Sequence, residues 1–455
     1  MLGTDNLKKI HLVGVGGAGM SGIAEILINM DYEVSGSDIH SSQITDRLQS
    51  LGLTFFNFHD KKNLKNVDLV VFSSAIDSNN PELIEAKNKE INTIRRAEML
   101  AHLTSLRESI IFAGSHGKTT TTCIAAHIFK ENNLDPTYII GGKVSSFESN
   151  ANLGSGRHIL AEADESDGSF LLFTPDKAVI TSIDNDHLEA YGQSVKKLEF
   201  SFIEFIQKVK KKVFIYDEKK ALIKNLTSEL NIFTYGFDMH SDFQILDFFQ
   251  NEQGSFFSLK DKINDTLFDF EINMHGRHNV LNTVAAIIVS FDEGMTYSSI
   301  SKSLKTFPQV ERRFEIISKN VFSKNIILID DYGHHPTELI NTINTIKEIW
   351  PDKEMVMAFQ PHRYSRTKAL FNEFIEVLSK IDNLILLEIY PASEAPIQNY
   401  SSHDLFKKIR NFNRKSVLVN GIDEAFVEFK KFNNEKYIFL TQGAGNTSIR
   451  ASKFK

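Results

Sequence analysis

The segment from Ile110 to Ile124, IIFAGSHGKTTTTCI, constrains the fold of this chain more than any other part of it. It begins as a short apolar run, passes through two glycines, and continues with Lys118, four threonines and an apolar helical pattern. This order predicts a strand, a tight loop and a helix. Such a loop directs backbone N–H groups and the positive end of a helix at one point, which suits a polyphosphate.

The side chains of this loop are typical of a phosphate site. Lys118 supplies a mobile positive charge for the β and γ phosphates, and the Thr119 hydroxyl is placed to ligate Mg²⁺. A strict Walker A motif has glycine six residues before the lysine, where this chain has Phe112, so the loop is a shortened variant. The alternative is a glycine-rich turn with a surface lysine, and the flanking strand and helix signals argue against it.

A second glycine-rich turn follows the first apolar stretch of the chain. Gly14, Gly16 and Gly19 form the pattern G-x-G-x-x-G between a predicted strand and helix. The next predicted strand, over residues 33–37, ends at Asp38, and a further strand is predicted over residues 69–72. This motif places a pyrophosphate over a helix N-terminus and a ribose beside a carboxylate. Taken alone it predicts NAD, and an NAD-dependent oxidoreductase is the corresponding function. A UDP-sugar presents the same two groups, so the motif indicates a nucleotide diphosphate of either kind.

Acidic residues cluster after a later strand, in the run HILAEADESDGSF. Glu162 ends the predicted strand, and we expect it to coordinate Mg²⁺ beside the phosphate loop. For Glu165 and Asp167 a solvated acidic loop is an equally good interpretation. His187 follows the next predicted strand, over residues 178–183, and lies among further carboxylates. It is a candidate ligand of a second cation because ligands gather at the carboxyl ends of parallel strands.

The second half of the chain repeats the order of strand, polar loop and helix. Its predicted strands lead into polar loops that contain Asp331, His334 and Arg366, as expected for a further α/β unit with function at one edge. Before this unit, a short antiparallel excursion is predicted over residues 237–274. A linker over residues 307–313 follows it.

Length and composition are those of a multidomain globular protein. The chain has 455 residues, enough for about three domains. Its net charge of −7 gives no global basic field for nucleic acid or an anionic membrane, and no apolar run approaches the ~18 residues that span a bilayer. The single cysteine, Cys123, fits a reducing cytoplasm. We therefore expect a cytoplasmic protein that binds neither nucleic acid nor membrane.

The motifs together resemble the Mur ligase family, from about residue 11 to residue 449. The resemblance is carried by VGVGGAGMSGIA, GSHGKTTTT, EADESDGSF, DNDHLEAY, GRHNVLN, ERRFE, DDYGHHPTE, FQPHRYSRT, YPASEAP and QGAGN, in this order. It implies an α/β fold of three domains. These are a Rossmann-like UDP-sugar-binding domain (1–106), a central P-loop-type ATPase domain with a mostly parallel sheet and a small antiparallel part (107–312), and a C-terminal Rossmann-like domain (313–455).

The resemblance also implies an activity: ATP-dependent ligation of an amino acid to the carboxylate of a UDP-muramyl substrate through an acyl phosphate. The motifs GGAGMSGIA and EADESDGSF are similar to those of the family members that attach L-alanine to UDP-N-acetylmuramate in peptidoglycan synthesis. The implied cofactors are ATP and two Mg²⁺ ions, for which Mn²⁺ can substitute.

Site residues are implied motif by motif. The catalytic residues would be Lys118, His187, Arg313, His334 and Arg366. ATP would contact Gly114, Ser115, His116, Gly117, Lys118, Thr119, Thr120, His278, Asn279, Arg313 and Asp331. The UDP-sugar would contact Gly14, Gly16, Gly17, Gly19, Asp38, Ser73, Ser74 and His116, and the metals Thr119, Glu162 and His187.

Three other functions remain as alternatives. A sibling ligase would add a different amino acid or a recycled peptide to the same kind of substrate. An NAD-dependent oxidoreductase would explain the first glycine motif but not the phosphate loop or the acidic cluster. A nucleotide-gated binding protein would bind ATP without turnover.

Overall fold

The computed structural model describes residues 7–141, 149–184, 188–192, 194–219, 222, 226, 230–308, 312–392, 394–432 and 434–448. By its internal contacts the chain forms two compact units. Unit 1 comprises Met1–Phe248, Phe256–Ile272 and Asn279–Pro308, and unit 2 comprises Phe249–Ser255, Asn273–His278 and Gln309–Lys455.

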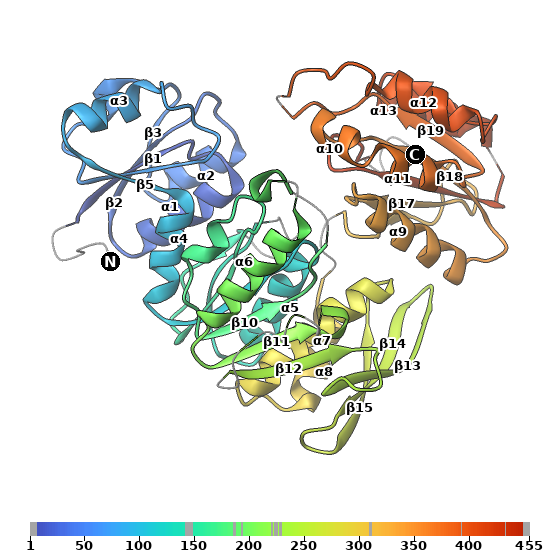
Figure 1. The fold of residues 1–455 in the computed structure, drawn as a ribbon, viewed down its shortest axis with the longest axis horizontal. Helices are drawn as coiled ribbons and strands as arrows, with labels where there is room; N and C mark the ends of the chain where they lie inside the picture. Colours follow the sequence, from blue (N-terminus) through green and yellow to red (C-terminus); the bar gives the residue numbers. More distant parts are fainter. Residues whose placement is uncertain are drawn as a thin grey trace. The chain divides into compact units, whose positions relative to one another are not determined.

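The N-terminal part of unit 1 is a five-stranded parallel sheet with helices packed on it (blue in Figure 1). The strand order is β3-β2-β1-β4-β5, so β2 lies on one side of β1 and β4 on the other. The glycine turn that follows β1 is therefore at the topological switch point of the sheet. The strands are β1 (Lys9–Val13), β2 (Glu33–Ser37), β3 (Thr54–Phe56), β4 (Leu69–Phe72) and β5 (Asn92–Arg95). The helices are α1 (Ala18–Asn29), α2 (Gln43–Ser50), α3 (Pro81–Asn88) and α4 (Arg96–Ser105).

A ten-stranded sheet follows, in the order β15-β14-β13-β12-β11-β10-β6-β9-β7-β8. Strand β6 lies between β10 and β9, and all three run parallel, which brings their carboxyl ends to one edge. The strands are β6 (Glu108–Ala113), β7 (Thr137–Ile139), β8 (Ala151–Asn152), β9 (His158–Glu162), β10 (Lys177–Ile180), β11 (Lys212–Tyr216), β12 (Asn231–Gly236), β13 (Phe243–Asn251), β14 (Gly254–Asp261) and β15 (Thr266–Ile272). The helices are α5 (Lys118–Glu131), α6 (Val195–Gln207), α7 (Arg277–Asp292) and α8 (Tyr297–Thr306).

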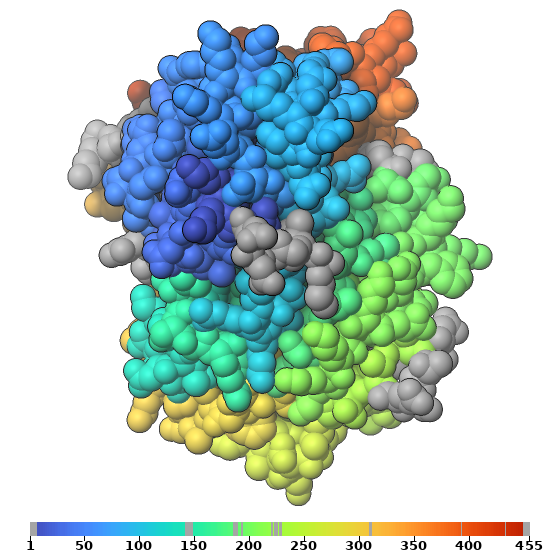
Figure 2. Space-filling model, turned by 90° about the vertical axis from the view of Figure 1, so that its left-hand side faces the viewer, coloured from blue at the N-terminus to red at the C-terminus, as the bar shows by residue number. Residues whose placement is uncertain are grey.

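One apolar core serves both parts of unit 1. Residues of β1 and α1, such as Leu12 and Ile23, belong to the same buried cluster as Ile111 of β6 and Phe202 of α6. Figure 2 shows the face on which the blue N-terminal residues and the cyan to green central residues appear together.

Unit 2 contains a six-stranded sheet in the order β16-β17-β21-β18-β19-β20, in which β16 is antiparallel to β17. Buried clusters cover its two faces, one around Phe359 and Phe374 and the other around Phe429 and Phe439. The strands are β16 (Glu315–Ser318), β17 (Ile327–Asp331), β18 (Glu354–Phe359), β19 (Asn383–Leu387), β20 (Val417–Val419) and β21 (Tyr437–Gln442). The helices are α9 (Pro336–Ile349), α10 (Tyr364–Ala369), α11 (Phe371–Leu378), α12 (Ser402–Arg410) and α13 (Ile422–Phe429).

The α/β class with mostly parallel sheets is confirmed. Strands β13, β14 and β15 are consecutive in the chain and adjacent in the sheet, and β13 and β14 are joined by a two-residue turn, as an antiparallel hairpin requires. The strand predicted over residues 178–183 ends earlier, at Ile180. The strand ends there because the side chains of Thr181 and Ser182 form hydrogen bonds with the phosphate loop.

Among the described residues, no helix combines the length and the apolar character needed to cross a membrane.

Candidate active site

The phosphate loop joins the buried strand β6 to α5 and depends on glycine at two positions. Gly114 and Gly117 have φ values of +139° and +85°, a region that other residues rarely adopt. A Cβ atom on Gly114 would lie 2.3 Å from Thr181 Oγ1, and one on Gly117 would lie 2.2 Å from Asn282 Oδ1. The loop backbone is therefore packed against two polar side chains, and only glycine at these two positions leaves room for them.

Lys118 is the first residue of α5 and is held by two acceptors. Its Nζ donates to the Gly114 carbonyl and to Glu165 Oε2, each at 2.5 Å. Burial disfavours the charged form of Lys118, but the surrounding carboxylates outweigh burial, and the pKa of the ammonium group lies above its ordinary value. The lysine is consequently a fixed positive charge at the helix N-terminus, where a phosphate would bind.

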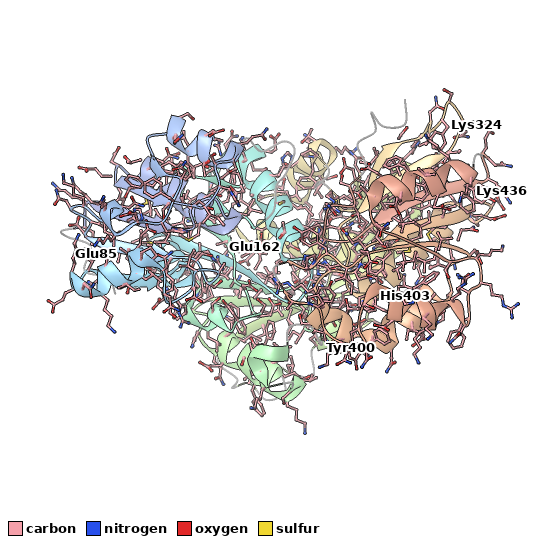
Figure 3. All side chains as sticks on the ribbon, turned by 90° about the horizontal axis from the view of Figure 1, so that it is seen from above. Glu85, Glu162, Lys324, Tyr400, His403 and Lys436 are labelled. Carbon is pink, nitrogen blue, oxygen red and sulfur yellow. The ribbon has the colours of Figure 1, made fainter. Side chains whose placement is uncertain are left out.

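Thr119 and Glu162 form the predicted metal pair. Thr119 Oγ1 donates to Glu162 Oε2 at 2.8 Å, and Glu162 Oε1 accepts from the Gly141 N–H at 2.7 Å. Glu162 is the last residue of β9, beside β6, and it is labelled in Figure 3. A hydroxyl and a carboxylate are hard oxygen donors of the kind that Mg²⁺ prefers, so these residues fit the ion that the sequence predicts.

The short segment after β10, residues 181–184, holds the phosphate loop in place through hydrogen bonds. Ser182 Oγ accepts from the His116 N–H at 2.8 Å, and Thr181 Oγ1 donates to the His116 carbonyl at 2.5 Å. The Ser115 hydroxyl accepts from the Asp184 N–H at 2.9 Å. Sequence reasoning missed this segment, and it also missed Asn282 on α7. The one available signal was the polar run that interrupts the apolar strand after Ile180.

The glycine turn of the N-terminal sheet is held by Asp38, the acidic residue of the fingerprint, and lies against Ser73. Asp38 Oδ2 accepts from the Gly16 N–H at 2.9 Å. The Ser73 N–H donates to the Val13 carbonyl at 3.2 Å, and its Cβ would lie 3.3 Å from a Cβ on Gly14. The turn, the carboxylate and the end of β4 are thus gathered at one place, with Ser74 exposed beside them.

Asp331, at the end of β17 in unit 2, has both carboxylate oxygens occupied by protein. Oδ1 accepts from the Gly333 N–H and from Gln442 Nε2, each at 2.8 Å, and Oδ2 accepts from the Phe314 N–H at 2.8 Å. Thr342 adds a longer hydrogen bond of 3.2 Å. In this structure Asp331 therefore shapes the turn that carries Tyr332 and His334.

The two neighbouring arginines of unit 2 have different environments. Arg312 Nε donates to Asp330 Oδ2 at 2.9 Å, and its Nη2 donates to the Gly443 carbonyl at 2.6 Å. Both arginines lie over the Tyr332 ring, Arg312 at 5.3 Å and Arg313 at 5.2 Å, but Arg313 approaches the carboxylate of Glu338 only at 3.9 Å. Arg312 is committed to the fold, and Arg313 is the better candidate to meet a phosphate.

Two histidines and an arginine, His334, His362 and Arg366, follow the carboxyl ends of β17 and β18. The His362 ring stacks on Tyr390, with ring centroids 5.5 Å apart, and lies 5.7 Å from the His334 ring. Arg366 Nη1 lies 3.3 Å from His362 Nδ1. Burial and the neighbouring cations lower the pKa of His362 to about 4, so this ring is neutral near pH 7. The arrangement offers several donors to an anion.

The predicted residues therefore fall into three groups. Within unit 1 the structure brings Lys118, Thr119 and Glu162 together, and it gathers the glycine turn with Asp38 and Ser73. Within unit 2 it brings His334 and Arg366 together through His362. Asn279 is buried at the start of α7, 3.5 Å from Asn282 Nδ2, and Thr120 is buried on α5.

Two other predictions have a different outcome. His278 shares α7 with Asn279 but belongs to unit 2 by its contacts. His187 lies outside the described residues, so its role as a metal ligand stays a prediction.

The fold is a parallel α/β fold with a phosphate loop. The lysine and threonine of this loop bond carboxylates at the end of the neighbouring strand β9 and just after it. These features define a nucleotide-binding protein of the phosphoryl-transfer class. Three family models match in chain order. They are the Mur ligase family, catalytic domain (residues 9–108), the Mur ligase middle domain (112–290) and the Mur ligase, glutamate ligase domain (312–445).

Whole-chain relatives agree with these matches. A UDP-N-acetylmuramate–L-alanine ligase from Psychrobacter sp. is 42% identical over 97% of this chain and 93% of its own length. A protein of the same name from Hydrogenovibrio crunogenus is 45% identical over 89% of both chains. The crystal structure of UDP-N-acetylmuramate-alanine ligase from Thermotoga maritima matches with a TM-score of 0.80, at 28% identity over 98% of both chains. The chain belongs to the Mur ligase family.

Proposed function

We propose that this protein joins L-alanine to the lactyl carboxylate of UDP-N-acetylmuramate, and converts ATP to ADP and phosphate, in peptidoglycan precursor synthesis. The full-length relatives at 42% and 45% identity are named for this activity. The observation that carries the proposal is the cluster of Lys118, Thr119 and Glu162, whose ammonium, hydroxyl and carboxylate groups suit a nucleoside triphosphate and its metal.

The chemistry explains why such a cluster is needed. A carboxylate and an amine do not condense in water unaided, so the carboxylate oxygen first attacks the γ-phosphorus of ATP, and ADP leaves. The amine of L-alanine then attacks the acyl phosphate, and phosphate leaves with the carboxylate oxygen. The first step brings two anions together. Lys118 supplies the fixed positive charge that offsets their repulsion.

Thr119 and Glu162 would hold one Mg²⁺, and we assign a second ion to His187, with Mn²⁺ as a substitute for either. The metal would neutralise charge on the transferred phosphoryl group. We also assign Arg313 to ATP, and His334 and Arg366 to the substrate side. Cys123 is the only cysteine, and on this ground we place the enzyme in the cytoplasm.

The proposal is tested by incubating the full chain with UDP-N-acetylmuramate, ATP, Mg²⁺ and a mixture of amino acids, followed by mass spectrometry of the nucleotide product. We expect the mass of UDP-N-acetylmuramoyl-L-alanine. A product carrying another amino acid or a peptide would assign the chain to a sibling activity, and ATP binding without any product would contradict ligation. Glycine and L-serine belong in the mixture because one small group is worth only about 1–3 kcal/mol in a pocket.

Lys118→Ala tests the phosphate-loop assignment. We expect ligation to fall at least ~10³-fold, about 4 kcal/mol of barrier, because the charge on the γ-phosphate is no longer offset. Lys130→Ala is the matched control, since Lys130 is exposed in the last turn of the same helix. Alanine-dependent ADP release at a near wild-type rate in Lys118→Ala would refute the assignment.

A further inference from the structure

Arg96 is the first residue of α4, and its side chain lies against the glycine turn between β1 and α1. A Cβ atom on Gly19 would lie 3.1 Å from Nη1, 3.2 Å from Cδ and 3.4 Å from Cζ of Arg96. The guanidinium group therefore covers the Gly19 backbone directly. In the usual dinucleotide fingerprint the third glycine allows a helix to pack closely on a strand. In this chain the third glycine makes room for an arginine.

Within the part of the chain that the structure describes, no hydrogen-bonding partner explains the position of the Arg96 guanidinium. It is half-buried, and among the residues that the structure describes its nitrogens make no hydrogen bond, ion pair or ring contact. Arg47, which also packs near α1, shows the contrast because it donates to both oxygens of Glu25, at 3.0 and 2.7 Å. A guanidinium is always charged, and partial burial without a partner costs free energy. The position therefore suits an anionic ligand.

The surroundings of Arg96 favour a phosphate over a carboxylate of the protein. Helix α1 begins at the turn and has no acidic residue in its first turn, so its positive end is not neutralised. Arg96 thus lies against a glycine turn whose positive helix end is not offset by an acidic residue in the first turn of α1.

We propose that Arg96 binds the diphosphate of the UDP-sugar. Two N–H groups of its guanidinium would donate either to one oxygen of each phosphate or to two oxygens of a single phosphate. The planar fork suits such paired acceptors, which a lysine would meet only as a point charge. The identity of the nucleotide rests on the proposed function, and the assignment of Arg96 goes beyond it. The glycine turn supplies backbone donors, and Arg96 supplies the charge that distinguishes a diphosphate from a neutral ligand.

Titration calorimetry of the full chain with UDP, UMP and uridine tests this assignment. Arg96→Gln is expected to weaken UDP binding about 10–100-fold, as loss of a charged hydrogen-bonding pair does. Its effect on UMP should be smaller, and uridine binding should be unchanged. The matched control is Arg95→Gln, because Arg95 is the adjacent residue and is exposed, and it should bind UDP within twofold of wild type. Equal UDP affinity in Arg96→Gln and wild type, or an equal loss in Arg95→Gln, would overturn the assignment.

ATP binding, measured with Mg²⁺ on the same preparations, separates a local effect from misfolding. We expect Arg96→Gln to bind ATP as wild type does. If it does not, Arg96→Lys decides, since it keeps the charge and the helix: a loss confined to UDP supports the assignment, and an equal loss for UDP and ATP overturns it. Wild-type ligation is measured in parallel. Normal product formation together with unchanged UDP affinity in Arg96→Gln would refute the arginine assignment alone, whereas absence of product would refute the proposed function.

Discussion

Gly117 and Gly294 share a left-handed backbone, with φ values of +85° and +91°, but their surroundings differ. A Cβ on Gly117 would lie 2.2 Å from Asn282 Oδ1, whereas a Cβ on Gly294 would meet nothing within 4 Å. The two positions therefore separate the cost of backbone strain from the cost of a collision at the phosphate loop.

Gly117→Ala should lower ligation at least ~10²-fold, because Asn282 and the loop must move apart and the phosphate donors lose their alignment. Gly294→Ala should lose only about 1–2 kcal/mol of the free energy of unfolding, from backbone strain, and keep its activity. Steady-state rates and urea denaturation of both variants check this. Retained activity in Gly117→Ala would show that the loop tolerates the displacement and that Asn282 does not fix its geometry.

At the scale of elements, Glu82 of α3 links β1 to β2 next to the glycine turn. Its fully buried carboxylate accepts from Ser37 Oγ at 2.6 Å and from Asn63 Nδ2 at 2.7 Å, and it lies 3.3 Å from His11 Nε2. The Ser37 carbonyl in turn accepts from the Gly14 N–H at 2.8 Å. Burial raises the pKa of Glu82, but hydrogen bonds from its neighbours outweigh burial and lower the pKa to about 2.

Glu82→Gln should therefore destabilise the protein in a pH-dependent way. The folded-state pKa of about 2 lies below the ordinary value of 4.5, so the carboxylate contributes stability above pH 4.5 that is lost as the pH falls toward 2. We expect the difference in unfolding free energy between wild type and Glu82→Gln to be about 2 kcal/mol larger at pH 7 than at pH 3.

Urea denaturation across this pH range measures the difference. The control is Glu33→Gln on β2, whose ion pair with Lys9 is exposed and should change stability by less than about 1 kcal/mol at any pH. A destabilisation by Glu82→Gln that is the same at pH 3 and pH 7 would show that the carboxylate is not ionised in the folded protein.

Much of this level of structure could be predicted from the sequence. The strands at residues 33–37 and 69–72 match the prediction residue for residue, because apolar runs bounded by polar residues mark buried parallel strands well. The pairing of Thr119 with Glu162 also follows from two strand ends meeting at one edge. The segment at 181–184 and Asn282 escaped prediction because their contacts with the phosphate loop arise only when distant parts of the chain pack. Arg96 escaped for the same reason.

At the scale of the whole molecule, strands β13 and β14 and helix α7 each have residues in both units. Strands β13 and β14 belong to unit 1 except for their tip, Phe249–Ser255, and α7 starts with residues of unit 2 and continues in unit 1. The only tryptophan, Trp350, lies in unit 2 and is 5% exposed. Its indole Nε1 donates to Glu252 Oε1 at 2.7 Å, on the hairpin tip. Trp350 fluorescence therefore reports on unit 2, beside a hairpin tip whose two strands continue into unit 1.

We expect the two units to unfold together, because unfolding unit 1 alone would remove the strands that support Glu252. UDP, which we assign to residues of unit 1, should then raise the urea midpoint seen by Trp350 fluorescence as much as the midpoint seen by far-UV circular dichroism. At a UDP concentration 100 times its Kd the added free energy is about 2.7 kcal/mol. Glu252→Ala should lower the fluorescence midpoint and bring it below the dichroism midpoint, since it removes the hairpin's bond to the indole. The contrary result would be a wild-type fluorescence transition that precedes the dichroism transition and whose midpoint does not change with UDP. Unit 2 would then be an independently folding body, and the continuity of β13, β14 and α7 would contribute no cooperativity.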